Sequence, residues 1–312
     1  MSRSFTWHLS LCALMSLSWV AKAAEVNVYS YRQPQLIQPM FAVFTQETGI
    51  AVNAVYAKTG MLERLRSKGR NSPADLVFTV DIGRLTDTVS AGLTQPVESA
   101  ALNANIPANF RDPDGHWFGL TARARLIVTS RKRVAAGEMT RYEQLAEPKW
   151  KGRLCTRSAK HPYMVALTAS IIAAHGLDTA KRWLQGVKKN LARKPQGNDR
   201  TQVKAIYSGL CDVAVINHYY LAKMLADEEQ NPWAKSVRVI FPNQNDRGTH
   251  MNVSGVALTK YAPNRAGAVK LMEFLASPRG QALYAEKNGE YPVSVGLGLG
   301  QNLKLHNPLL ES

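Results

Sequence analysis

The alternation of strand-like and helix-like segments limits the possible folds of this chain more than any other feature. Apolar, strand-like runs at residues 25–30, 50–56 and 75–80 are each followed by an amphipathic helical pattern. A strand, a helix and a second strand in this order usually form a right-handed crossover between parallel strands. The first third of the chain therefore predicts an α/β unit built on a parallel sheet.

A second run of the same kind begins near residue 125. Its strand-like segments lie at residues 125–130, 152–156 and 211–216, and the last is almost continuously apolar, as is typical of a buried parallel strand. The 312 residues are enough for two domains. We therefore expect an α/β fold of two lobes, in which each lobe has a mainly parallel sheet with flanking helices.

Two hinge-strand crossovers are expected to divide the chain, near residues 121–128 and 252–259. Residues 25–122 and 253–312 would form a discontinuous first lobe, and residues 123–252 the second. An alternative is that the C-terminal part packs on the second lobe. Ligands of open α/β sheets bind at strand ends, so a binding site is expected in the cleft between the lobes.

Residues 1–24 have the features of a secretory signal peptide. Arg3 precedes a mostly apolar stretch at residues 9–20, and small residues at 23–24 follow it. The apolar stretch is too short and too rich in serine for a permanent membrane anchor. We expect cleavage next to Ala24 and a mature protein in the periplasm.

Two cysteines, Cys155 and Cys211, remain after the predicted signal peptide is removed together with Cys12. In an oxidising compartment such a pair favours a disulfide, and two buried free thiols are the alternative.

The chain is basic but carries no sign of nucleic-acid binding or catalysis. Its formal charge is +16, and removal of Arg3 and Lys22 with the signal peptide leaves +16 − 2 = +14. The basic residues are spread along the sequence without a nucleic-acid motif, which indicates at most a preference for anionic ligands. No G-x-S-x-G, H-E-x-x-H or P-loop motif occurs. We therefore expect neither an enzyme nor a nucleic-acid partner.

Three tyrosines occupy matching positions at strand ends. Tyr219 and Tyr220 follow the apolar run at residues 211–216, and Tyr163 follows the run at residues 152–156. Ferric iron prefers anionic oxygen ligands, and a bound ion can deprotonate a phenol whose free pKa is near ~10. The three phenols could therefore bind Fe(III) at one sheet edge, although two adjacent tyrosines can equally be packing residues.

Three further residues could bind a small anion. Arg32 and Gln33 follow the first strand, where the guanidinium could hold an anion bidentately and the amide could hydrogen-bond it. Arg123 flanks the first crossover and could face the cleft. An ordinary surface arginine is the alternative reading of Arg32.

One more helix start lies at residues 197–202. Asp199 and Gln202 resemble the ends of a capping box, which would open a helix over the residues up to 208. The N-terminus of this helix could face the cleft, but a plain cap explains the pattern equally well.

Five short segments are similar to those of a known family. They are Tyr-Ser-Tyr-Arg-Gln-Pro at 29–34, Gly-Leu-Thr-Ala-Arg-Ala-Arg at 119–125, His-Pro-Tyr at 161–163, Pro-Gln-Gly-Asn-Asp-Arg at 195–200 and Asn-His-Tyr-Tyr at 217–220. With these segments the chain resembles the periplasmic ferric-iron-binding proteins of bacterial iron ABC transporters. The resemblance implies a transferrin-like, type 2 periplasmic binding protein that closes on Fe(III). It also implies delivery of the iron to an inner-membrane ABC permease, and we expect a monomer.

The resemblance assigns the metal to Tyr163, Tyr219 and Tyr220. Many family members add a histidine after the first strand, sometimes followed by a tyrosine, whereas this chain has Gln33 and Pro34. The residues that supply a direct ligand from the first lobe in those members are therefore absent here.

A synergistic anion such as carbonate, held by Arg32, Gln33 and Arg123, would complete the coordination, with Tyr31 as an alternative ligand. The competing function is a periplasmic binding protein for another small ligand, an organic anion or a polyamine.

Overall fold

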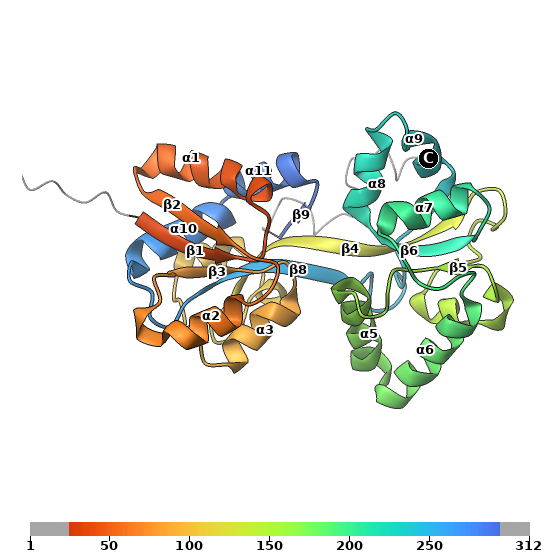
Figure 1. The fold of residues 1–312 in the computed structure, drawn as a ribbon, viewed down its shortest axis with the longest axis horizontal. Coiled ribbons are helices and arrows are strands. Elements are labelled where there is room, and N and C mark those ends of the chain that lie inside the picture. The colour runs from red at the N-terminus through yellow and green to blue at the C-terminus, as the bar shows by residue number, and fades with distance from the viewer. Residues whose placement is uncertain (1–24, 294–312) are drawn as a thin grey trace, which may run out of the picture.

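The expected two-lobed α/β fold is confirmed by the structure, a computed structural model that describes residues 25–293 (Figure 1). The predicted signal peptide at residues 1–24 and the C-terminal segment 294–312 lie outside the described residues. Within the described part, no helix is long and apolar enough to cross a membrane.

The first lobe contains a three-stranded parallel core. Strand β1 (Glu25–Ser30) pairs with β2 (Ala51–Tyr56) on one side and with β3 (Leu76–Phe78) on the other. Its helices are α1 (Gln38–Thr48), α2 (Met61–Lys68), α3 (Ile82–Ser90), α4 (Ala100–Asn105), α10 (Arg265–Ala276) and α11 (Pro278–Asn288). Apolar clusters on both faces of the sheet form its core.

The second lobe also combines strands with flanking helices. Its strands are β5 (Leu154–Cys155), β6 (Val213–Asn217) and β7 (Val237–Ile240). Its helices are α5 (Pro162–His175), α6 (Leu177–Asn190), α7 (Asp199–Tyr207), α8 (His218–Leu225) and α9 (Asn231–Lys235). Two apolar clusters pack against its sheet, one on each face.

Two long strands run between the lobes. Strand β4 (Phe118–Ser130) pairs with β8 (Met251–Leu258) through residues 118–124, and with β6 and β7 beyond that point. The short strand β9 (Tyr291–Pro292) adds to β4 near the crossing. Figure 1 shows β4 and β8 side by side where the chain passes from one lobe to the other.

The strand directions differ from the expectation of mainly parallel sheets. The β1–β2, β1–β3 and β5–β6 pairs are parallel, whereas every pair that involves β4 or β8 is antiparallel. The reason is geometric: one strand leaves the first lobe and the other returns to it, so the two run in opposite directions. The register places the carboxyl ends of β1, β2 and β3 at the edge that faces the second lobe, and those of β5 and β6 at the edge that faces the first.

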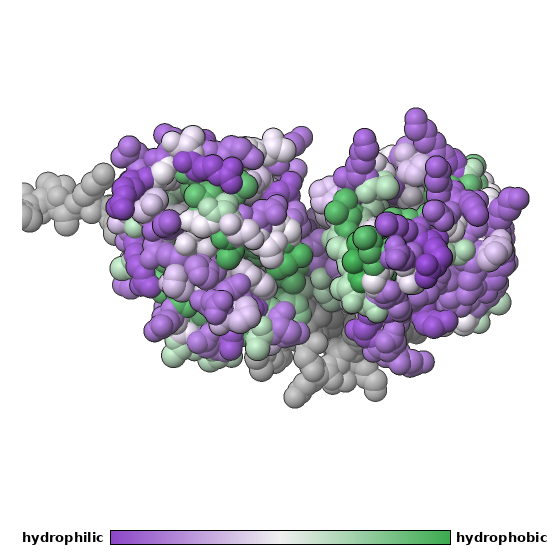
Figure 2. All heavy atoms as spheres, turned by 90° about the horizontal axis from the view of Figure 1, so that it is seen from below, coloured by the Kyte–Doolittle hydropathy of each residue, from purple (hydrophilic) through white to green (hydrophobic). Residues whose placement is uncertain are grey.

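Figure 2 shows the groove between the lobes from below, with a mostly hydrophilic surface and some apolar side chains beside the groove on the second lobe. Among the exposed apolar residues, Val165 and Ile172 belong to α5, which borders this groove.

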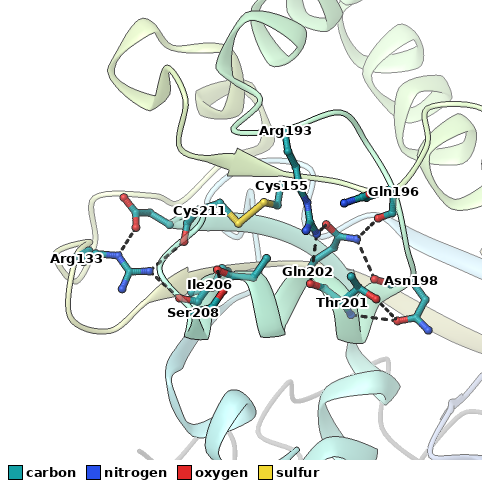
Figure 3. The surroundings of a disulfide bond; sticks show 12 residues. Arg133, Cys155, Arg193, Gln196, Asn198, Thr201, Gln202, Ile206, Ser208 and Cys211 are labelled. Atoms are coloured by element: carbon teal, nitrogen blue, oxygen red, sulfur yellow. Dashed lines mark hydrogen bonds and ion pairs between the residues drawn. A yellow bond between two sulfur atoms is a disulfide. The ribbon is translucent and has the colours of Figure 1, made fainter.

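The disulfide lies at the two strands that precede the predicted tyrosines. Cys155 and Cys211 are bonded with their Cα atoms 6.0 Å apart and a sequence separation of 56 (Figure 3). Arg133 lies beside this bond and donates to the carbonyl of Cys211 at 3.0 Å. The bond therefore links the end of β5 to the residues that lead into β6.

Replacing both Cys155 and Cys211 with serine should lower the free energy of unfolding by about 2–4 kcal/mol, because the unfolded chain regains the entropy of an open loop. Urea unfolding followed by circular dichroism measures the change. Wild type in reducing buffer should lose the same amount, which serves as a control. An unchanged urea midpoint in both samples would contradict the prediction.

Candidate metal site

A cavity of about 420 Å³ lies between the lobes, where the strand ends meet. Both lobes contribute to its wall, and most of the contributing side chains are polar or aromatic. The lining residues are Tyr31, Arg32, Gln33, Gln35, Leu36, Tyr56, Val80, Arg123, Tyr163, Arg200, Tyr219, Tyr220, Lys223, Asn288 and Glu290.

The three predicted metal ligands lie together on the second-lobe wall. Tyr219 and Tyr220 are in the first turn of α8, directly after β6, and Tyr163 is in the first turn of α5. The hydroxyl of Tyr163 lies 3.1 Å from that of Tyr219. The rings of Tyr219 and Tyr220 stack, with centroids 4.5 Å apart. The helix start directs these neighbouring phenols into one region, as the sequence predicts.

The proton on the central phenol is strongly held in this arrangement. Burial raises the pKa of Tyr219 well above its ordinary value, and the neighbouring phenols of Tyr163 and Tyr220 raise it further. A trivalent cation among the three oxygens would reverse this preference, because each phenolate would then face the metal charge. Within residues 25–293 no group of three or more His, Cys, Asp and Glu side chains could hold a metal. Among the described lining residues the anionic donors are thus the three phenols, since the one carboxylate, Glu290, is paired with Arg32.

Cationic side chains surround the three rings. Guanidinium carbons lie 5.2–5.8 Å from the ring centroid of Tyr163 and 5.3 Å from that of Tyr220, and an ammonium nitrogen lies 5.9 Å from that of Tyr219. The cations are Arg123, Arg125, Arg157, Arg200 and Lys223. This cationic collar favours negative charge at its centre, whether on phenolates or on a bound anion.

Arg32, the first predicted anion-binding residue, is paired with a carboxylate of the protein. It is 2% exposed, and its Nη2 donates to both oxygens of Glu290 at 2.9 Å. The Thr121 hydroxyl donates to the same carboxylate. Burial alone would raise the pKa of Glu290, but Arg32, Arg123 and these hydrogen bonds lower it to about 2. No local sequence pattern marks Glu290, which lies 258 residues from Arg32.

The other candidate anion-binding and metal-binding residues, from the first lobe and the first crossing strand, differ in exposure and in hydrogen bonding. Gln33 is exposed and accepts a hydrogen bond from Gln35. Arg123 is buried and donates through Nη2 to the carbonyl of Val80, while its Nε has no hydrogen-bond partner among the described residues. Tyr31 lines the cavity, but its hydroxyl accepts the backbone N–H of Leu62 at 3.1 Å, which favours the packing role.

The predicted capping box at residues 199–202 is wrong by one position. Asn198, not Asp199, is the N-cap of α7, and its side chain accepts the Thr201 N–H at 3.1 Å (Figure 3). Asp199 turns inward instead and pairs with Arg125 and Arg157 behind the tyrosines. An aspartate at a helix start satisfies either role, so the sequence pattern could not separate them.

Comparisons with known proteins identify the family to which the chain is similar. Residues 71–311 match the model of the bacterial extracellular solute-binding protein family. Iron uptake protein A1 of Synechocystis is 46% identical over 282 residues, which cover 89% of this chain and 78% of that protein. Ferric iron-binding protein A of Mannheimia haemolytica, solved in an open conformation, is 50% identical with a TM-score of 0.81, covering 88% and 87%. The Trichodesmium IdiA (FutA) protein in complex with iron and citrate is 43% identical with a TM-score of 0.84, covering 90% of each chain.

Proposed function

The chain belongs to the bacterial extracellular solute-binding protein family, and we propose that it is the periplasmic Fe(III)-binding component of an ABC-type iron importer. The observation that carries this proposal is the convergence of Tyr163, Tyr219 and Tyr220 on one wall of the cavity. Iron is the cargo here, so the protein binds and releases it without catalysing a reaction.

Charge balance explains why phenols suit this cargo. Three phenolates neutralise the charge of one ferric ion, so the exchange of three protons for one Fe³⁺ leaves the net charge of the site unchanged. The cationic collar would otherwise oppose the entry of a trication. Three oxygens also leave about three positions of an octahedral ion for other ligands.

A synergistic anion would fill part of the remaining coordination. Carbonate is the small candidate, and a solved relative holds iron together with citrate. Of the predicted anion-binding residues, Arg123 offers an unpaired Nε–H and Gln33 lies at the exposed rim. Arg32 would have to share its guanidinium between the anion and Glu290. Arg200 and Lys223 also line the cavity and add positive charge next to the phenols.

Membership of the same family also supports proposals about export, oligomeric state and the transport partner. We propose that residues 1–24 are a cleaved signal peptide and that the mature protein is a periplasmic monomer which docks on an inner-membrane permease. The lobes would be residues 25–122 with 253–312, and residues 123–252. The crossings on β4 and β8 support these boundaries.

Addition of Fe(III) to the purified protein should give a red-orange colour from phenolate-to-iron charge transfer. Titration with ferric nitrilotriacetate, followed by visible absorption, should saturate at one iron per chain. Protein that stays colourless and retains no iron after gel filtration would overturn the proposal.

A second candidate is a binding protein for an organic anion without iron. The cationic collar is the observation that favours it, and iron-free protein that binds citrate but no Fe(III) would select it. A polyamine is disfavoured, because Glu290 is the one carboxylate among the described lining residues and it is already paired.

A further inference from the structure

Asp199 is a fully buried carboxylate that connects three elements behind the tyrosines. It accepts a hydrogen bond from Arg125 Nη1 at 2.9 Å, from Arg157 Nη1 at 3.2 Å and from the backbone N–H of Asn217 at 2.7 Å. These donors belong to β4, to the segment between β5 and α5, and to the end of β6. One side chain therefore fixes the parts of the lobe that carry Tyr163 and Tyr219, although it does not line the cavity.

Arg157 extends this connection to two of the proposed ligands. Its guanidinium carbon lies 5.2 Å from the ring centroid of Tyr163, and its Nη2 lies 2.7 Å from Nε2 of His161, the N-cap residue of α5. Burial alone would lower the pKa of Arg157, but Asp199 and a hydrogen-bonding contact with Tyr220 raise it. The guanidinium is thus held between the buried carboxylate and the phenols.

We propose that Asp199 and Arg157 are positioning residues for ferric-iron binding. Asp199 holds the guanidinium of Arg157 in place. Arg157 in turn orients the ring of Tyr163 and places a positive charge beside the phenol oxygens when they bind iron. The inference rests on the proposed function, since it concerns the same three phenols.

Two physical effects follow from this arrangement. Groups that orient metal ligands typically change metal affinity by about 10–100-fold when they are removed. In addition, a positive charge close to a phenolate lowers the energy of its electrons, so charge transfer to iron needs more energy. Loss of the guanidinium should therefore weaken iron binding and shift the charge-transfer band to longer wavelength.

The opposite end of β6 offers a matched control. Asp212 precedes that strand, and its carboxylate also pairs with two arginines, Arg133 and Arg153. It lies in the same lobe but does not line the cavity. Asp212→Asn should cost stability as Asp199→Asn does, yet leave the iron spectrum unchanged.

The experiment compares wild type with Asp199→Asn, Arg157→Gln, Arg157→Lys and Asp212→Asn. Competition with nitrilotriacetate measures iron affinity, visible absorption measures the band, and thermal unfolding without iron measures stability. We expect Asp199→Asn and Arg157→Gln to lose about 10–100-fold in affinity with a band at longer wavelength. Arg157→Lys should recover part of both, because it keeps the charge but not the planar fork.

Three results decide the outcome. Variants of Asp199 and Arg157 that bind iron like wild type, with the wild-type band, would overturn the inference while leaving the iron-binding function intact. Equal losses in Asp212→Asn would overturn it too, because the effect would then be general destabilisation. If Asp199→Asn does not fold, the partly exposed Arg157 still carries the test through its two variants. A wild type that binds no iron would instead reject the proposed function.

Discussion

Tyr219→Phe should abolish the red-orange colour and lower the affinity for Fe(III) by more than about 100-fold, beyond the range expected for residues that only orient ligands. Tyr219 is the central member of the cluster: its hydroxyl lies 3.1 Å from that of Tyr163, and its ring stacks on Tyr220. Phenylalanine keeps the ring contacts but supplies no anionic oxygen. Two phenolates would then leave one positive charge of the ion uncompensated inside the cationic collar.

Tyr31→Phe provides the matched control for this substitution. Tyr31 lines the same cavity, but its hydroxyl accepts the Leu62 N–H rather than facing another phenol oxygen. We expect its iron affinity to stay within about 5-fold of wild type, since a neutral hydrogen bond contributes only about 1 kcal/mol. Competition titrations and absorption spectra of both variants give the comparison. Retained colour in Tyr219→Phe with loss in Tyr31→Phe would move the metal to the first-lobe side of the cavity.

The tyrosine cluster could be predicted because its position follows from topology. The runs at residues 152–156 and 211–216 are strands of one sheet, β5 and β6, and they pair in parallel. Their carboxyl ends therefore meet at one edge, and any side chains that directly follow them come together there. Adjacent phenols at 219 and 220 point apart in a regular strand, but the start of α8 changes the backbone direction between the strand and the helix.

The charges that surround the cluster could not be predicted, because they depend on long-range pairing. Glu290 follows α11, and it reaches Arg32 only because β9 pairs with β4 near the crossing. The sequence around Arg32 therefore predicts a guanidinium that is free to hold an anion. Asp199 was read as a cap for the same reason: its arginine partners lie on other elements, 42 and 74 residues away.

Strand direction was the second feature that could not be predicted fully from the sequence. Alternating strands and helices predict parallel pairs, and those pairs occur within each lobe. The sequences of β4 and β8 do not indicate strand direction. A buried antiparallel strand has the same apolar pattern as a buried parallel strand. The sequence predicted a strand at residues 125–130, which is part of β4, but not its neighbours.

Glu290→Gln should lower the free energy of unfolding at pH 7 by about 3–5 kcal/mol, because it leaves the buried guanidinium of Arg32 without its counter-charge. Both partners are almost fully inaccessible to solvent, so water cannot replace the lost carboxylate. Glu47→Gln is the control, since Glu47 pairs with Arg279 at an exposed site where such pairs contribute about 0–1 kcal/mol. Urea unfolding of the iron-free variants measures both changes. Equal losses of unfolding free energy in the two variants would show that the buried ion pair stabilises the fold no more than the exposed one.

The pH dependence gives this prediction a second, independent signature. The pKa of Glu290 is lowered from 4.5 to about 2 in the folded protein, so its contribution to stability is complete above the unfolded pKa. That contribution is lost as pH falls from 4.5 towards 2, because the unfolded chain takes up the proton first. Glutamine has no such proton, so the stability difference between wild type and Glu290→Gln should shrink progressively over this window. Glu47→Gln should keep a small difference throughout. A Glu290→Gln difference that stays constant from pH 7 to pH 3 would mean that shape, rather than charge, accounts for the loss.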